Sequence, residues 1–439
     1  MKRIIYFITT ICLSVASATA QQIEHVVLVS IDGFRPEFYK DNTMPTPNIQ
    51  WLAEQGVNAK GVKTIFPSVT YPSHTTLITG TLPYQHKVYY NTTIGEDGNP
   101  GQWIYDSKSV KAPTLWQAAK QQGLTTAAVS WPISLHNDFI DYNIPEIWNF
   151  KQPMDRLSAT LKYAHPQGLF EEILTKAIGE VDQDKYNLSS LAMDQNLGRA
   201  AVFILEEYKP NLLTVHLPNT DGAQHAVGRE GIEVKRAIAG ADFVIGSIID
   251  ALKRSEIYEQ SLIVITGDHG FVNTSMSISP NVWLEDAGLA EQAYFFSTGG
   301  SAFLELKDKA DKHTVRKVKQ MLLDLPMRYQ DMFELIEEDQ LRARGSKQGV
   351  SLAISARAGY SFSNKKEGEI LSATKGGKHG HYPNNPEIFT GFIAFSPVMK
   401  QSKQLEIIHL EDIAPSIAKV LKLALPQADG TSVLGGVIK

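Results

Sequence analysis

The sequence predicts an α/β protein in which helices cover both faces of a mostly parallel β-sheet. Three apolar runs have the continuity of strands that are buried on both faces, at 24–34, 211–217 and 261–270. Amphipathic stretches with helical periodicity separate these runs, beginning near 114, 191 and 232. Since strands that alternate with helices in this way form a doubly wound sheet, we expect that architecture here.

Residues 1–20 have the pattern of a secretory signal peptide. They combine a basic start, an apolar run and the small-residue end A-T-A. The apolar run is short for a membrane span, and no later run approaches about 18 apolar residues, so we expect a secreted, periplasmic chain without a transmembrane anchor. Cys12 is the single cysteine and leaves with the signal peptide. Any metal must therefore be bound by Asp, Glu and His.

The rest of the chain divides by pattern into a large domain and an insertion. Residues 272–372 mix helix-like and strand-like segments and are predicted to form a smaller α+β insertion, or cap. Residues 21–271 and 373–439 are then the first and second parts of one catalytic α/β domain. The second part contains a further apolar strand at 391–397.

The charge of the chain excludes one class of partner. Loss of Lys2 and Arg3 with the signal peptide takes the formal net charge from −5 to −7, and no Lys/Arg-rich tract stands out. This argues against binding of a nucleic-acid polymer and favours a small-molecule substrate. The oligomeric state cannot be predicted from these features.

Polar side chains gather where the predicted strands end. In an α/β sheet these carboxyl ends are where ligands bind. The residues concerned are Asp32 after the first strand, Asp221 and His225 after the second, and Asp268 and His269 after the third. His379 and His381, in the loop before the last strand, compete for a similar place. Carboxylate and imidazole ligands together favour zinc, and manganese or iron less strongly.

Two zinc ions about 3.5–4 Å apart suit phosphoryl transfer, which also needs a nucleophile. The stretch PSVTYPSHTTLITG at 67–80 is rich in hydroxyls. Pro72 suits the first turn of a short helix and Gly80 suits its end, so Thr70 lies just before the predicted helix start. Such a threonine is either a cap or a hydroxyl that faces a bound phosphate at the positive end of the helix.

Taken in order, these residues resemble the nucleotide pyrophosphatase/phosphodiesterase family (type I phosphodiesterases) of the alkaline phosphatase superfamily. The resemblance extends over nearly the whole mature chain. It rests on an Asp-Gly after the first strand, a Thr-aromatic-Pro-x-His segment, an Asn shortly after it, an Asp with a His four residues on, an Asp-His-Gly and a late His-Gly. Here these are Asp32, Thr70, Asn91, Asp221 with His225, Asp268 with His269, and His379 with Gly380.

The resemblance implies an alkaline phosphatase-type fold, two Zn²⁺ per chain and Thr70 as the nucleophile. One zinc site would use Asp32, Thr70, Asp268 and His269, and the other Asp221, His225 and His379. Asn91 and a backbone N–H near Thr70 would hold a phosphoryl oxygen, and Tyr71 would pack on a nucleotide base. The implied reaction is hydrolysis of a phosphodiester or phosphoanhydride through a phosphothreonine intermediate.

Two positions depart from the family pattern. Gln224 stands before His225 where the family usually has glycine, and His381 stands where an aromatic residue usually follows the His-Gly. His379 is the better ligand, because the family ligand lies 18 residues before the proline that ends the following strand, here Pro397. This choice would leave His381 at the rim of the site. We expect His74 and His86 to be structural.

The main alternative is a phosphomonoesterase of the same superfamily. Threonine-using phosphatases carry a Lys-x-Arg pair in an insertion, and the region 131–165 has no such pair. A sulfatase is disfavoured because its nucleophile is followed by Pro and Arg, whereas Thr70 is followed by Pro72 and His74. A non-catalytic metal- or phosphate-binding protein would have no need of the complete set of residues, and a structural zinc site would favour cysteine.

Overall fold

The computed structural model describes residues 22–188, 190–309 and 311–436. The predicted signal peptide and its junction with the mature chain therefore lie outside the described residues. None of the helices in these ranges is long and apolar enough to cross a membrane. The elements described below account for the position of every predicted site residue.

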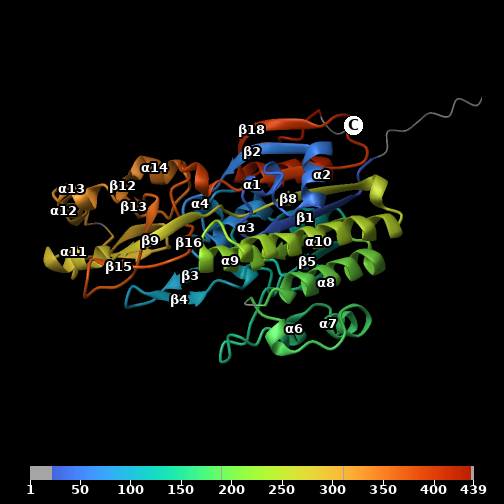
Figure 1. The fold of residues 1–439 in the computed structure, drawn as a ribbon, viewed down its shortest axis with the longest axis horizontal. Helices are drawn as coiled ribbons and strands as arrows, with labels where there is room; N and C mark the ends of the chain where they lie inside the picture. Colours follow the sequence, from blue (N-terminus) through green and yellow to red (C-terminus); the bar gives the residue numbers. More distant parts are fainter. Residues whose placement is uncertain (1–21, 189, 310, 437–439) are drawn as a thin grey trace, which may run out of the picture.

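An eight-stranded sheet forms the centre of the molecule (Figure 1). Its strands, in spatial order, are β18 (Lys403–His409), β2 (Val57–Lys63), β17 (Phe392–Phe395), β8 (Ser261–Thr266), β1 (His25–Ile31), β7 (Leu212–Leu217), β5 (Thr126–Val129) and β6 (Tyr142–Ile144). All neighbours are parallel except β17, which is antiparallel to both β2 and β8. The predicted doubly wound, mostly parallel sheet is confirmed, and it includes the three strands recognised in the sequence.

Helices cover both faces of this sheet, and alternate residues of β1 face the two sides. Val27 and Val29 belong to one apolar core, with α2 (Pro47–Gln55), α8 (Ala192–Tyr208) and α10 (Ile232–Arg254). Val26 and Leu28 belong to the second core, with residues of α3 (Thr70–Thr79), α5 (Leu115–Gln121) and α15 (Ile413–Val420). Burial on both sides explains why the strand sequence is continuously apolar.

The remaining helices are short, and most connect the sheet to its surroundings. They are α1 (Glu37–Lys40), α4 (Pro83–His86), α6 (Leu157–Tyr163), α7 (Leu169–Ile173), α9 (Asn219–Val227), α11 (Pro280–Asp286), α12 (Lys312–Leu323), α13 (Met327–Gln330) and α14 (Glu338–Ala343). α9 directly follows β7 and carries two of the predicted metal ligands.

Smaller sheets lie to one side of the main sheet (Figure 1). One contains β10 (Ala293–Ser297), β11 (Ser301–Leu306), β13 (Leu352–Ala356) and β12 (Phe333–Glu337), and another joins β9 (Val272–Ile278) to β14 (Gly359–Phe362), β15 (Leu371–Ala373) and β16 (Gly377–Lys378). β3 (Thr92–Ile94) and β4 (Pro100–Trp103) form a separate hairpin. The stretch predicted as an insertion has its own apolar core, around Trp283 and Phe295. Its status as a separate domain stays a prediction.

Candidate active site

The register of three central strands brings the predicted ligands to one edge of the sheet. Ile31 of β1 pairs with Leu217 of β7, and Ser30 pairs with Thr266 of β8, so these strands end side by side. Asp32 directly follows β1, and the Asp268–His269 pair follows β8. Asp221 and His225 lie one turn apart on α9. Sequence and topology together therefore account for a concentration of charge at this edge.

Each carboxylate of the cluster has one oxygen that lacks a hydrogen-bond partner among the described residues. These atoms are Asp32 Oδ1, Asp221 Oδ1 and Asp268 Oδ2, and all three are buried. The other oxygen of Asp268 accepts the backbone N–H groups of Gly33 and His269, both at 3.0 Å. Buried polar atoms normally have partners, so a group of unpartnered carboxylate oxygens on one edge fits the binding of a cation.

The three histidines are oriented in the same way. Nδ1 of His225, His269 and His379 lies 3.0–3.1 Å from the carbonyl oxygens of Gly377, Gly270 and Ser68, respectively. A carbonyl can only accept, so the proton is on Nδ1 and Nε2 is left as the electron-pair donor. This arrangement is typical of histidines that bind a metal through Nε2.

The Nε2 atoms face the orphaned oxygens. His269 Nε2 lies 3.1 Å from Asp268 Oδ2 and 3.5 Å from Asp32 Oδ1. Nε2 atoms of His225 and His379 lie 3.3 and 3.7 Å from Asp221 Oδ1. Ligand atoms that surround a tetrahedral zinc ion at about 2.0–2.1 Å are about 3.3 Å from one another. The donor atoms are thus spaced as the ligands of a metal ion are.

The two groups of ligands are in contact with each other. The rings of His269 and His379, one from each predicted site, stack with their centroids 3.7 Å apart. Asp221 belongs to two groups of side chains whose potential ligand atoms all lie within 4.8 Å of one another. One group also contains His225 and His379, and the other contains Asp32 and His269. The structure therefore brings together all six of the predicted Asp and His ligands, and how they divide between two ions stays a prediction.

Burial and neighbouring charges shift the pKa values of two members of the cluster. Burial, followed by the charges of Asp268 and Asp221, raises the pKa of Asp32 well above its ordinary value. Burial, with the neighbouring His269 and His225, lowers the pKa of His379 well below its ordinary value. His379 is thus neutral at physiological pH, as a metal ligand must be.

Thr70 is the first residue of α3, and Gly80 ends the helix with the left-handed φ of +68°. Thr70 lines the site cavity, and its Oγ1 makes no hydrogen bond to any residue in the described ranges. The neighbouring hydroxyls are less suitable. Ser68 Oγ donates to the carbonyl of His381 and accepts from the N–H of Gly380, whereas Ser73 is completely buried.

Asn91 lies against the start of the same helix. Its Oδ1 accepts the backbone N–H of Tyr71 at 2.9 Å. This bond uses the acceptor of the side chain and the N–H that follows Thr70, so the Asn91 Nδ2 group is the donor that remains for a ligand. The structure places Asn91 beside Thr70, as expected, and its catalytic role stays a prediction.

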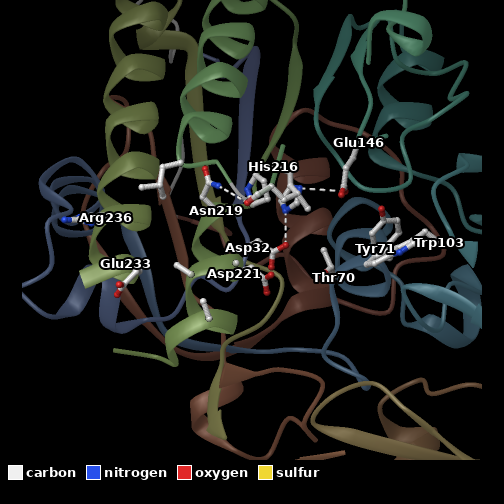
Figure 2. Close-up of a pocket in the computed structure, with 16 residues that line it drawn as sticks. Asp32, Thr70, Tyr71, Trp103, Glu146, His216, Asn219, Asp221, Glu233 and Arg236 are labelled. Atoms are coloured by element: carbon white, nitrogen blue, oxygen red, sulfur yellow. Dashed lines mark hydrogen bonds and ion pairs between the residues drawn. The ribbon is translucent and has the colours of Figure 1, made fainter. Parts of the chain in front are cut away.

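A cavity of about 580 Å³ opens beside the predicted metal ligands (Figure 2). Asp32, Thr70 and Asp221 are among the residues that line it. Tyr71 is only 1% exposed and packs against Trp103, whose ring centroid is 5.2 Å away. Trp103 is 43% exposed and therefore offers the more accessible aromatic surface.

Sequence reasoning missed several residues of the cavity, including His216, Glu146 and Trp103. His216 stands inside a strand whose other residues are apolar except Thr214, and a histidine at such a place was the available signal. Glu146 and Trp103 come from segments without a recognisable motif, so the sequence contained no comparable signal for them.

The expectation for His381 was wrong. His381 is fully buried rather than at the rim, and its ring lies against the backbone of Gly300, where an added Cβ would overlap it. His379 is the residue that approaches Asp221.

The unusual Gln224 is also buried, and its Nε2 donates to the carbonyl of Gly33 at 3.0 Å. Gln224 thus supports the turn that follows Asp32.

The two histidines expected to be structural are both fully buried. His86 contacts Thr76 Oγ1 through Nε2, remote from the ligands. His74 is closer to the site, because its Nδ1 lies 2.8 Å from the carbonyl of Thr70 and 3.8 Å from Asp268 Oδ2. His74 therefore lies between the backbone of Thr70 and the predicted ligand Asp268.

Asp194 accepts a hydrogen bond from the first residue of α9, and its burial predicts a pH-dependent change in the stability of the fold. Asp194 and Asn219 exchange hydrogen bonds between backbone N–H and side-chain oxygen, both 3.1 Å long. Burial raises the pKa of Asp194 to about 7. The unfolded value is about 3.9, so the folded state binds more protons between the two values, and stability falls as the pH rises from about 4 to about 7.

We expect Asp194→Asn to remove this part of the pH dependence. In urea unfolding of the metal-free protein, the free energy of unfolding of the variant relative to the wild type should rise with pH, by at most about 4 kcal/mol between pH 4 and 7. Parallel pH profiles for the two proteins would contradict the assignment of this titration to Asp194.

The fold and the site together define a protein of alkaline phosphatase-like α/β architecture. The family model described as type I phosphodiesterase / nucleotide pyrophosphatase matches residues 26–381, and the chain therefore belongs to that family. This confirms the family predicted from the sequence motifs. Members of the family are phosphodiesterases and nucleotide pyrophosphatases, which are hydrolases.

Relatives of the chain include ectonucleotide pyrophosphatase/phosphodiesterase family member 3 of Mus musculus, 24% identical over 57% of this chain and 25% of that protein. Member 5 of Homo sapiens is 24% identical over 62% of this chain and 50% of that protein. The chain thus spans half or less of the length of these two relatives. The solved structure of murine member 5 matches with a TM-score of 0.69 and 20% identity, over 93% of this chain and 97% of that one.

Proposed function

We propose that the protein is a secreted, zinc-dependent phosphodiesterase or nucleotide pyrophosphatase that works through a covalent intermediate on Thr70. The observation that carries this proposal is that Thr70 lines the cavity beside six Asp and His side chains, whose unpartnered carboxylate oxygens and Nε2 atoms face one another. The residues that would hold two zinc ions are Asp32, Thr70, Asp221, His225, Asp268, His269 and His379. When bound, such ions lower the pKa of hydroxyl groups and water and stabilise negative charge on phosphoryl oxygens.

The residues of the chain perform the rest of the reaction. Thr70 Oγ1 loses its proton and forms a bond to phosphorus, while the bond from phosphorus to the leaving oxygen breaks and that oxygen is protonated. The intermediate is a phosphothreonine ester that still carries the retained group of the substrate. The oxygen of a water molecule then bonds to the same phosphorus, the bond from phosphorus to Thr70 Oγ1 breaks, and Oγ1 takes up a proton released by that water. Overall, a diester and water give a monoester and an alcohol.

Two further groups would hold the substrate during both steps. The Asn91 amide N–H₂ is placed to donate to a non-bridging phosphoryl oxygen, because its own oxygen is engaged by the N–H of Tyr71. The aromatic wall made by Tyr71 and Trp103 suits the flat face of a nucleotide base. Because Tyr71 is covered, we infer that Trp103 provides most of the contact area.

The family membership favours small nucleotides as substrates. Murine member 5 has also been solved as an inactive variant in complex with AMP, and the proposed base-binding wall is consistent with a ligand of that chemistry. The alternative of a phosphomonoesterase has less support, since the cation that lines the cavity is the exposed Arg236, and no Lys-x-Arg pair was found in the sequence. A non-catalytic binding protein would not need Thr70 to be exposed to the cavity.

The proposed location is the periplasm, which rests on the signal-peptide pattern of residues 1–20. An enzyme in this compartment would act on small phosphate esters that are present outside the cytoplasm. Fractionation of cells that express the full chain, with detection of the mature N-terminus near Gln21, tests this part of the proposal.

Hydrolysis of three chromogenic esters by the mature chain tests the activity. We expect bis-p-nitrophenyl phosphate and the p-nitrophenyl ester of thymidine monophosphate to be cleaved at least about tenfold faster than p-nitrophenyl phosphate, a difference of about 1.4 kcal/mol in barrier. A chelator should abolish both diester activities, and zinc should restore them. Preference for the monoester would identify a phosphatase, and inactivity with added zinc would favour a binding protein.

A further inference from the structure

His216 is a buried histidine that the mechanism above does not use. It lies in β7, and its neighbours Leu217 and Val215 are apolar core residues. Only 2% of its surface is exposed, and it lines the cavity between Asp32 and Glu146 (Figure 2). A polar ring at this place in a central strand is costly unless both of its nitrogens have partners.

Both ring nitrogens of His216 face oxygen atoms that only accept hydrogen bonds, so the ring bonds to both when each nitrogen carries a proton. Nδ1 lies 3.1 Å from the carbonyl oxygen of Ser130, which directly follows β5. Nε2 lies 3.1 Å from Asp32 Oδ2. Glu146, itself buried and 3.6 Å from Arg156, adds a negative charge 4.0 Å from Nδ1. The ring is therefore held at a fixed angle, with Nε2 directed at one oxygen of a predicted metal ligand.

Because of the contact with His216, the two carboxylate oxygens of Asp32 have different surroundings. Oδ2 is bonded to His216, whereas Oδ1 has no hydrogen-bond partner in the described ranges and faces His269 Nε2 at 3.5 Å. The two oxygens of Asp268 also differ in this way, but its Oδ1 accepts hydrogen bonds from two backbone N–H groups. Among the described residues no backbone N–H donates to the side chain of Asp32, and the side chain of His216 takes that place.

We propose that His216 is a positioning residue that orients the Asp32 carboxylate so that Oδ1 is presented to a metal ion. The inference rests on the proposed function, because it assumes that Asp32 is a ligand. Hydrogen bonds to the second oxygen of a ligating carboxylate fix its plane, and loss of such outer partners reduces metal affinity. A purely structural role, as a link between β5 and β7, would instead affect stability alone.

Zinc affinity, measured on the metal-free mature chain by competition with a chromophoric chelator, separates these roles. His216→Leu removes the donor, whereas His216→Gln keeps an N–H group near the position of Nε2. We expect the leucine variant to lose about 10- to 100-fold in affinity for one of two zinc ions, and the glutamine variant to stay within about threefold of the wild type. Affinity for the other ion should change little.

His86→Leu is the matched control, because His86 is equally buried but bonds to Thr76 and the Val88 N–H, outside the site. It should lower the thermal unfolding temperature without changing zinc affinity. Unchanged zinc affinity in His216→Leu would overturn the positioning role while leaving the proposed function intact. Equal losses in the leucine and glutamine variants would also overturn it. A wild-type chain that binds no zinc would instead refute the proposed function.

Discussion

Replacement of Thr70 by alanine is expected to lower kcat for diester hydrolysis by about 10³-fold or more, because the variant has no oxygen to form the covalent bond to phosphorus. Thr70→Ser keeps a hydroxyl and should retain measurable activity. Ser73→Ala is a matched control on the same helix, since the Ser73 hydroxyl is buried and has no partner among the described residues. Its activity should be close to that of the wild type.

The covalent step can be observed directly. Acid quenching of the wild-type chain during turnover of a diester should yield a fraction whose mass is increased by the esterified phosphoryl group, and peptide mapping should place that group on Thr70. The alanine variant should show no such adduct. An active Thr70→Ala variant, or an adduct on another residue, would contradict the assignment of the nucleophile.

The central sheet could be predicted because the sequences of its central strands are almost continuously apolar. β1, β7 and β8 are buried on both faces, so their residues are almost continuously apolar, and a charged residue marks the end of each strand or of its turn. In a parallel sheet these ends share one edge, so Asp32 and Asp268 could be placed together without a structure. The spacing of Asp221 and His225 was compatible with a helix, and α9 provides it.

What escaped prediction depends on contacts between segments that are far apart in the chain. The burial of His381 follows from its packing against Gly300, and the role of Gln224 follows from its bond to Gly33. Trp103 reaches Tyr71 through the β3–β4 hairpin, which contains no catalytic motif. No local pattern records such pairings, because hydrophobic periodicity reports only which face of an element is buried.

The largest opposing effects on activity and stability are expected for Asp32→Asn. The amide is a poor replacement for a charged ligand oxygen, so zinc affinity and diester hydrolysis should each fall by about 100-fold or more. In the metal-free chain, however, Asp32 is buried near Asp221 and Asp268, and its pKa is raised by burial and by these charges. Removing its charge should therefore stabilise the metal-free protein.

The pH dependence of this stabilisation has a definite sign. Because the folded-state pKa of Asp32 is above its unfolded value of about 3.9, ionisation destabilises the fold as the pH rises above about 4. The advantage of Asp32→Asn in thermal unfolding with chelator should consequently be larger at pH 8 than at pH 5. Added zinc should reverse the order, since a ligand at about 1,000 times its Kd stabilises the wild type by about 4 kcal/mol.

Asp242→Asn provides the control for loss of a buried carboxylate. Asp242 accepts the Ile49 N–H at the start of α2 and contacts none of the predicted ligands. Its replacement should reduce stability and leave the zinc-induced shift unchanged. If Asp32→Asn instead lowers the stability of the metal-free chain, or keeps the full zinc-induced shift, the cluster is not held together by cations. If Asp32→Asn stabilises the metal-free chain and reduces the zinc-induced shift, the ligand cluster destabilises the metal-free fold and is stabilised by bound metal.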